Sequence, residues 1–389
     1  MSLELLRAQT PLTAEDKLRI DRALNSPRKP DHLACEVAQA RPFLDYTFRF
    51  VGGYFIDCPV RIFGGEADTI FTYVRVTPER GEPVTLRDRF EIPRMPDELR
   101  PRVNLKHVST NINCSGGFGL GEGRYTVELI LCDKNSRVLR KHWRIAVTRS
   151  HAEQTTALTM KPSTVGPLFV NRWNGKVRSS EQGPKLTVLL DATPIFQFAH
   201  KLHAKDTILL LDSLYSLLTE QPWSSVQLIA FNLDQQQEVF RDDHFSRLGW
   251  YALEDRLREL ELGKVSYKVV SHPYGWSDLL AQLVNEQIRS PNPPDAAVFL
   301  GPNTRIHQKP TSPLTPAKMG TPEFFYVEYY PPWDRGNEMP DAVAFVTREL
   351  NGQILKIHSP AELSQAIHKI DTQLNSSRGR AELMPSGSR

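Results

Sequence analysis

Several oxygen-bearing side chains stand at, or a few residues beyond, the ends of apolar runs in the second half of the chain. They are Asp191, Thr193, Asp234 and Asn303. In an open sheet of parallel strands, the carboxyl ends meet at one edge, and ligands bind beyond that edge. Carboxylate, hydroxyl and amide oxygens gathered there are the ligand types that Mg²⁺ prefers. The spacing therefore identifies this edge as the first place to look for chemistry.

The same residues are too few for a complete metal site. Asp191 and Thr193 supply about two oxygens, and Ile195, two positions further on, cannot coordinate a cation. Ser277 is the nearest candidate for a third hydroxyl ligand. The loop Gly301-Pro302-Asn303 contains no carboxylate. We therefore expect no bound metal or other cofactor, and we interpret Asp191 first as a cap for the amide groups of its own loop.

The periodicity of apolar residues between Lys185 and Leu374 predicts the helices and strands that would position these residues. Short apolar runs that predict buried strands alternate with stretches of helical period. The expected strands are 186–190, 226–231, 265–270, 296–300, 324–330 and 353–357, and the expected helices are 202–218, 248–262, 277–288 and 359–374. This alternation predicts a doubly wound, mainly parallel α/β sheet.

This order of elements resembles a von Willebrand factor A domain. The resemblance rests on a strand that ends in Asp191, a following helix, the sequence Val-Gln-Leu-Ile-Ala-Phe-Asn over 226–232, and the later strand 296–300. It covers about 190 residues in topology but few in motif. That family binds a divalent cation through an Asp-x-Ser-x-Ser loop, a distant Thr and a distant Asp. Asp191 and Thr193 match two of these positions, Ser277 is a candidate for the distant hydroxyl, and Ile195 and Asn303 depart from the pattern.

The resemblance implies a protein-binding or adhesion-type module that has lost most of its metal ligands, rather than an enzyme. Tyr and Trp are favoured at protein interfaces, and several lie in the later loops. The residues expected on the binding face are Asp191, Thr193, Asp234, Tyr274, Trp276 and Asn303. The opposing interpretation is that the aromatic residues seal the contact between the two domains or fill a core.

An enzymatic alternative is a phosphatase or hydrolase that resembles the haloacid dehalogenases, with Asp191 as its nucleophile. Those sites also begin with an Asp at the end of the first strand. Here the second Asp two positions later is replaced by Thr193, and the Gly301 loop lacks the metal-binding Asp. Without Mg²⁺ such a site cannot neutralise the charge that develops during phosphoryl transfer.

The first half of the chain follows a different period. Between 41 and 149, short runs of β-branched and aromatic residues alternate with glycine-containing turns, which predicts an all-β sandwich. The clearest unit is the hairpin 123–147, in which Tyr125, Val127, Leu129 and Leu131 share one face. It resembles the last hairpin of immunoglobulin-like and fibronectin-like modules. The predicted parts are an extension with a short helix capped at Thr13 (1–40), the sandwich (41–149), a linker (150–184), the α/β domain (185–374) and a disordered tail (375–389).

Composition limits the partners and the cellular location. The net charge is +3 from 48 basic and 45 acidic residues, and this balance argues against a nucleic-acid partner. No apolar run is long enough to span a membrane. The N-terminus lacks a signal peptide, which favours the cytoplasm, whereas the plan resembles bacterial extracytoplasmic A-domain proteins. The four cysteines, Cys35, Cys58, Cys114 and Cys132, are interpreted as buried thiols, with disulfides and export as the alternative.

Overall fold

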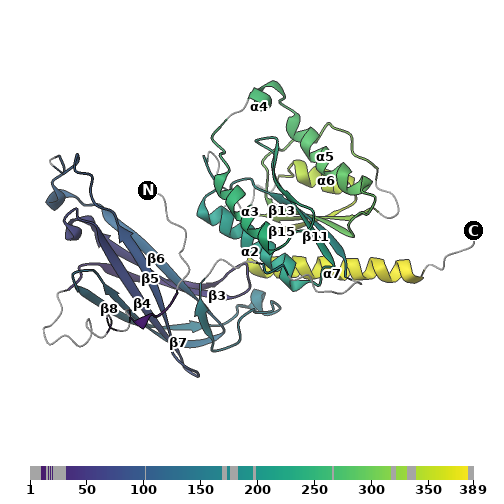
Figure 1. Ribbon diagram of the computed structural model, residues 1–389. Coiled ribbons are helices and arrows are strands. Elements are labelled where there is room, and N and C mark those ends of the chain that lie inside the picture. Colours follow the sequence, from purple (N-terminus) through teal and green to yellow (C-terminus); the bar gives the residue numbers. More distant parts are fainter. Residues whose placement is uncertain are drawn as a thin grey trace, which may run out of the picture. The chain divides into compact units, whose positions relative to one another are not determined.

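The chain divides into two compact units, Met1–Val170 and Asn171–Arg389, in the computed structural model shown in Figure 1. The residues that the structure describes are 10–14, 16, 18, 20, 32–100, 102–168, 173–175, 183–195, 199–264, 267–316, 321–330 and 339–383. Within these residues, no helix is both long and apolar enough to cross a membrane.

Two antiparallel sheets make up the first unit. One contains β1 (Thr10–Pro11), β5 (Val84–Ile92), β4 (Asp68–Pro78), β7 (Gly123–Cys132) and β8 (Val138–Val147), in that spatial order. The other contains β2 (Glu36–Leu44), β3 (Phe50–Pro59), β6 (Asn111–Leu120) and β9 (Val165–Pro167). Short 3₁₀ helices, η1 (Val60–Phe63), η2 (Leu105–His107) and η3 (His151–Glu153), lie between strands. Inward-facing side chains of both sheets form one hydrophobic core.

The hairpin of β7 and β8 shows how the sequence dictates this core. Tyr125, Val127, Leu129 and Leu131 are all buried, and the residues between them are more exposed. The prediction that these four share one face is therefore confirmed. In the turn between β7 and β8, the Asp133 side chain accepts a 2.8 Å hydrogen bond from the backbone N–H of Arg137. An Asp side chain that bonds to nearby backbone amides stabilises such turns.

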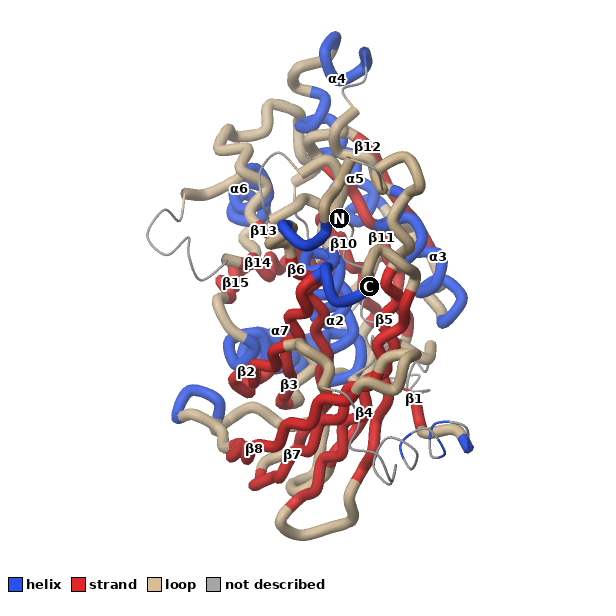
Figure 2. Tube along the Cα trace, turned by 90° about the vertical axis from the view of Figure 1, so that its left-hand side faces the viewer, coloured by secondary structure: helices blue, strands red, loops and turns tan. Residues whose placement is uncertain are grey.

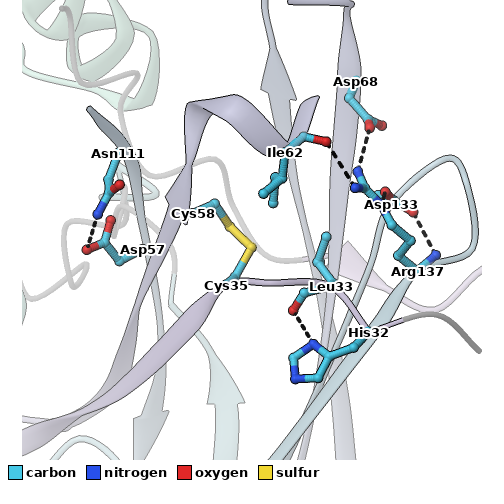
Figure 3. The surroundings of a disulfide bond; sticks show 10 residues. All are labelled: His32, Leu33, Cys35, Asp57, Cys58, Ile62, Asp68, Asn111, Asp133 and Arg137. Carbon is cyan, nitrogen blue, oxygen red and sulfur yellow. Dashed lines mark hydrogen bonds and ion pairs between the residues drawn. A yellow bond between two sulfur atoms is a disulfide. The ribbon is translucent and has the colours of Figure 1, made fainter. Parts of the chain in front are cut away.

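A disulfide joins Cys35 to Cys58, the first just before β2 and the second within β3 (Figure 3). The interpretation of all four cysteines as thiols is therefore wrong for this pair, which neighbouring antiparallel strands hold side by side. Cys114 and Cys132 are free thiols. Burial raises the pKa of the Cys114 thiol to about 11, so it is protonated and unreactive at neutral pH.

The second unit is built on a single sheet of six strands (Figure 2). Their spatial order is β12 (Gln237–Asp242), β11 (Ser225–Asn232), β10 (Lys185–Asp191), β13 (Ala296–Pro302), β14 (Glu323–Tyr329) and β15 (Gln353–Ile357). The helices are α2 (Ala204–Glu220), α3 (Arg247–Glu259), α4 (Tyr267–Ser271), α5 (Gly275–Arg289), α6 (Ala342–Glu349) and α7 (Pro360–Leu383). Apolar residues of α5 and α6 share a core with five of the six strands.

The predicted fold class, with its doubly wound α/β domain, is wrong. The chain is mostly β, with two antiparallel sheets and one mixed sheet, in which β12 runs antiparallel to β11. Only the residues 233–236 connect these two strands, and so short a connection can join only antiparallel neighbours. The strand expected over 265–270 is also missing from the sheet, because Tyr267–Ser271 forms the helix α4.

Local boundaries differ from the sequence prediction at several further points. The helix α5 begins at Gly275, two residues before the predicted start at Ser277. The helix α7 extends to Leu383, through part of the segment 375–389 that was expected to be disordered. The strand β9 lies inside the expected linker 150–184. Thr13 and Asp16, by contrast, make the expected reciprocal bonds: Asp16 N–H donates to Thr13 Oγ1 over 3.2 Å, and Thr13 N–H donates to Asp16 Oδ2 over 2.8 Å.

We expect removal of the Cys35–Cys58 disulfide to destabilise the first unit. The bond closes a loop of sequence separation 23, and the chain entropy that such a loop removes from the unfolded state corresponds to about 3 kcal/mol. The double variant Cys35→Ala/Cys58→Ala should lose stability of that order in urea unfolding. The matched control is Cys114→Ala, which leaves the disulfide in place. Mass spectrometry of the oxidised wild type should find one disulfide and two thiols, and four thiols would contradict the pairing.

Candidate functional site

Asp191 ends the strand β10 and lies buried among backbone groups of its own loop. Its Oδ1 accepts hydrogen bonds from the backbone N–H of Thr193 over 3.0 Å and from the Thr193 hydroxyl over 2.7 Å. Its side chain packs against β13, because a Cβ added at Gly301 would lie 2.7 Å from the Cβ of Asp191. Asp191 is only 1% exposed. Its Oδ2 is buried and has no hydrogen-bond partner within the described part of the chain.

Neighbouring elements hold the loop 192–195 from several sides. Asn232, at the end of β11, donates from Nδ2 to the carbonyl of Ala192 over 2.9 Å. Asp206 in the first turn of α2 accepts from the backbone N–H of Ile195 over 3.2 Å. Arg305 donates from its guanidinium to the carbonyl of Ile195. Side chains from β11, from α2 and from Arg305 therefore hold the backbone of this loop in place.

Asp341 is a second buried carboxylate at the same edge of the sheet, and it is completely inaccessible to solvent. Its Oδ1 accepts from the backbone N–H of Ala344 over 2.8 Å, which caps the helix α6. Its Oδ2 accepts from the backbone N–H of Thr304 over 2.7 Å and from the Tyr326 hydroxyl over 2.9 Å. One carboxylate thus joins α6, the loop after β13 and the strand β14.

Glu328 on β14 is the third carboxyl group, with 1% of its surface exposed. One of its oxygens, Oε1, accepts from Asn303 Nδ2 over 2.7 Å and from the Tyr330 hydroxyl over 2.7 Å. Burial is the main cause that raises the pKa of Glu328 to about 7, and the neighbouring Asp341 raises it further. Glu328 therefore titrates near neutral pH.

Burial and neighbouring acidic groups both change the pKa values in this group of residues. Burial raises the pKa of Asp191 well above its ordinary range, and the charges of Asp341 and Asp234 act in the same direction. Burial also raises the pKa of the Tyr326 hydroxyl, again with a contribution from Asp341. Desolvation and like charge both favour the neutral acid. We call Asp191, Glu328 and Asp341, with their hydrogen-bond partners, the carboxyl cluster.

The carboxyl cluster lacks the features of a metal or nucleophilic site. Across the described ranges, no group of three or more His, Cys, Asp or Glu side chains is arranged to hold a metal ion. A nucleophilic carboxylate must reach its substrate, whereas Asp191 is buried and its Oδ1 is occupied by Thr193. The arrangement can hold the loop 192–195, the loop after β13 and the start of α6 in place, and Glu328 can change protonation near neutral pH.

The structure brings together only some of the residues expected from the sequence. Asp191 and Thr193 lie together, as described above. Ser277 contacts neither of them in the hydrogen-bond network, because its hydroxyl accepts from the backbone N–H groups of Thr311 and Ser312 over 2.9 and 3.0 Å. Trp276 is buried in the core of α5, α6 and the sheet. Asp234 and Tyr274 are exposed.

Asn303 does belong to the edge, but as a partner of Glu328 rather than as an open ligand. The sequence prediction did not include Glu328 or Asp341. Asp341 could have been found, because Pro340-Asp341 before the apolar segment Ala342–Val346 is a typical helix N-cap pattern. Glu328 carries no such signal, since a single Glu inside an apolar strand does not reveal its partners.

Comparisons with known proteins identify no family. No family model and no curated protein matches the chain. Among solved structures, a protein designated ApaA from Bordetella pertussis is 14% identical, with a TM-score of 0.20, and the match covers 32% of this chain and 100% of that one. A protein described as a β-galactosidase from Bacteroides fragilis is 9% identical, with a TM-score of 0.20, and the match covers 77% of this chain and 42% of that one. TM-scores this low support no conclusion about fold or function.

We expect Asp191 to act as a structural cap. Asp191→Ala removes the acceptor for the Thr193 amide and should lower the free energy of unfolding by about 1–3 kcal/mol. Asp191→Asn keeps an oxygen acceptor and should lose much less. Urea unfolding of both variants, with and without millimolar Mg²⁺, measures this. Strong stabilisation of the wild type by Mg²⁺ that disappears in both variants would show a metal site instead.

Glu328 should make stability depend on pH. The folded protein keeps this group protonated up to about pH 7, whereas the unfolded chain releases the proton near its ordinary pKa of 4.5. The folded state therefore binds more protons between these values, and the free energy of unfolding falls as pH rises from about 4.5 to 7.

Glu328→Gln should remove this loss and stabilise the protein by roughly 1–3 kcal/mol at pH 8, with a smaller effect at pH 5. Urea unfolding at both pH values measures the difference. The matched control is Glu349→Gln, at a glutamate on the exposed side of α6. An equal effect of Glu328→Gln at the two pH values would rule out the shifted titration.

Proposed function

We propose that this protein is a non-enzymatic protein-binding module, and that its second unit contributes a contact surface around α4. The observation that supports this most directly is a set of large side chains that face solvent within eight residues of sequence. Tyr267 is 93% exposed, Val270 is 65% exposed and Tyr274 is 58% exposed. Exposed apolar side chains are common singly, but grouped ones mark interaction sites.

The position of α4 suits such a contact. It lies at the end of the second unit opposite α7, where it projects beyond the sheet (Figures 1 and 2). The following helix is firmly held, because Trp276 and Leu280 are buried in the core. Tyr side chains lose little conformational entropy on binding and are frequent hot spots at interfaces. A mobile or loosely attached aromatic segment would be a poorer anchor.

The carboxyl cluster supports the non-enzymatic part of the proposal. Its acidic groups are buried, and they accept hydrogen bonds from loop amides and from tyrosine hydroxyls. Catalysis would require at least one of these groups to face a substrate. Of the residues expected on a binding face, Tyr274 is the one whose side chain is apolar and largely exposed.

Photo-cross-linking tests the proposed surface. A benzophenone amino acid placed at Tyr267 should give a covalent adduct of defined mass in the cells that natively produce the protein. The same amino acid at Glu259, an exposed position on α3, serves as the matched control and should give none. Adding Val270→Ser and Tyr274→Ser should lower the yield of the adduct by about tenfold or more, as expected when hot-spot side chains are truncated. Equal adducts from both positions would contradict the proposal.

A further inference from the structure

The strand β8 forms one edge of its antiparallel sheet, and β7 is its neighbour on the other side (Figures 1 and 2). The chain before β2 reaches only the first residue of this edge, where the backbone N–H of Leu33 donates to the carbonyl of Val138 over 3.2 Å. Within the described residues, no strand pairs with the outer side of 139–147. An unpaired edge presents backbone N–H and C=O groups that another extended segment can bind. The contact surface proposed around α4 does not involve this strand.

Lys141 places a positive charge on the inward face of this edge strand. It is opposite Leu129 in the register with β7, and Leu129 is buried in the core between the two sheets. Lys141 itself is exposed. Inward-pointing charges at a sheet edge oppose the addition of a further strand, because the charge would be buried without a partner. A segment that brings a carboxylate to Lys141 reduces this cost, and one without a carboxylate does not.

Arg144 places a second cation on the outward face of β8. It is exposed and is opposite Thr126 in the register. Arg124 on β7, opposite Ala146, is also exposed and shares this outward face. In the part of the chain that the structure describes, Lys141, Arg144 and Arg124 form no ion pair. The edge therefore carries uncompensated positive charge on both faces.

Trp143 adds a buried hydrogen-bond donor to the same edge strand. It is opposite Val127 in the register and packs against the core between the sheets. Its indole N–H is buried and has no hydrogen-bond acceptor among the described residues. Buried donors are rarely left unpaired in folded proteins. A further segment along β8 would bring backbone and side-chain acceptors to this edge.

We propose that the free edge of β8 binds an extended acidic segment of another protein, which joins the sheet as a further antiparallel strand. Main-chain hydrogen bonds supply affinity in this mode of binding, and side chains supply specificity. Lys141 and Arg144 are three positions apart and lie on opposite faces, so the segment needs two Asp or Glu residues at the same spacing. The residue opposite Trp143 is apolar, because it lies on the core side of the sheet. A second copy of β8 is an unfavourable partner, since both edges would be cationic.

Fluorescence polarisation with labelled peptides tests the proposal on the full chain. The probe is Thr-Val-Glu-Val-Thr-Glu-Thr-Val with blocked ends, whose first and second Glu face Arg144 and Lys141 in the antiparallel register. It should bind at least about tenfold more tightly than the same peptide with Gln at both Glu positions. A version with N-methylated backbone amides keeps both charges but cannot form the strand ladder, so it should not bind. Equal binding of the N-methylated peptide, tighter binding of heparin, or no binding of the acidic probe would overturn the proposal.

Variants of the protein assign the binding to β8. Lys141→Gln should weaken binding of the probe by about tenfold, and Arg144→Gln by about threefold, because the Arg144 contact remains in water. Arg102→Gln is the matched control, since it removes an exposed cation from the connection between β5 and β6, neither of which pairs with β8. Lys141→Glu should abolish binding of the probe and should bind a peptide with Lys in place of the second Glu. Circular dichroism verifies folding, and a folded Lys141→Glu protein with unchanged affinity for the probe would overturn the assignment.

Discussion

The carboxyl edge of the mixed sheet depends on the hydrogen bonds that the buried side chain of Asp341 accepts. A buried carboxylate is costly unless hydrogen bonds replace the water it has lost. Asp341 obtains those bonds from Ala344, Thr304 and Tyr326, which belong to α6, the loop after β13 and the strand β14. The three elements are therefore coupled, since the loss of any one leaves this buried side chain without one of its hydrogen-bond donors.

Burial is also the main influence on the neighbouring carboxyl groups of Asp191 and Glu328. Desolvation raises the pKa of each, and the nearby Asp341 contributes in the same direction. Glu328 also receives hydrogen bonds from Asn303 and Tyr330, which lower its pKa without cancelling the effect of burial. Within the cluster, Asp341 therefore connects three elements, while Asp191 and Glu328 have raised pKa values.

How much of this could be predicted from the sequence depends on the range of the interactions. Patterns between residues a few positions apart predicted the structure correctly. Examples are the alternation of buried residues from Tyr125 to Leu131 and the capping bonds between Thr13 and Asp16. The predicted doubly wound class failed because an apolar run such as 265–270 does not by itself distinguish a short helix from a strand. The Cys35–Cys58 bond was undetermined for a related reason, since four cysteines allow three pairings and only strand register selects one.

The carboxyl cluster shows the same division on a smaller scale. The Asp191 to Thr193 contact spans two residues, and the sequence predicted it as an Asx-type cap. The closure of that loop by Arg305, Asn232 and Asp206 involves residues up to 110 positions away, and no spacing rule reveals it. Loop closure is what separates a capped strand end from an open site, because the same Asp and Thr could face a ligand if these partners were absent. Polar residues at the end of a strand therefore identify where a site could form, and the distant partners of its loop determine whether it remains accessible.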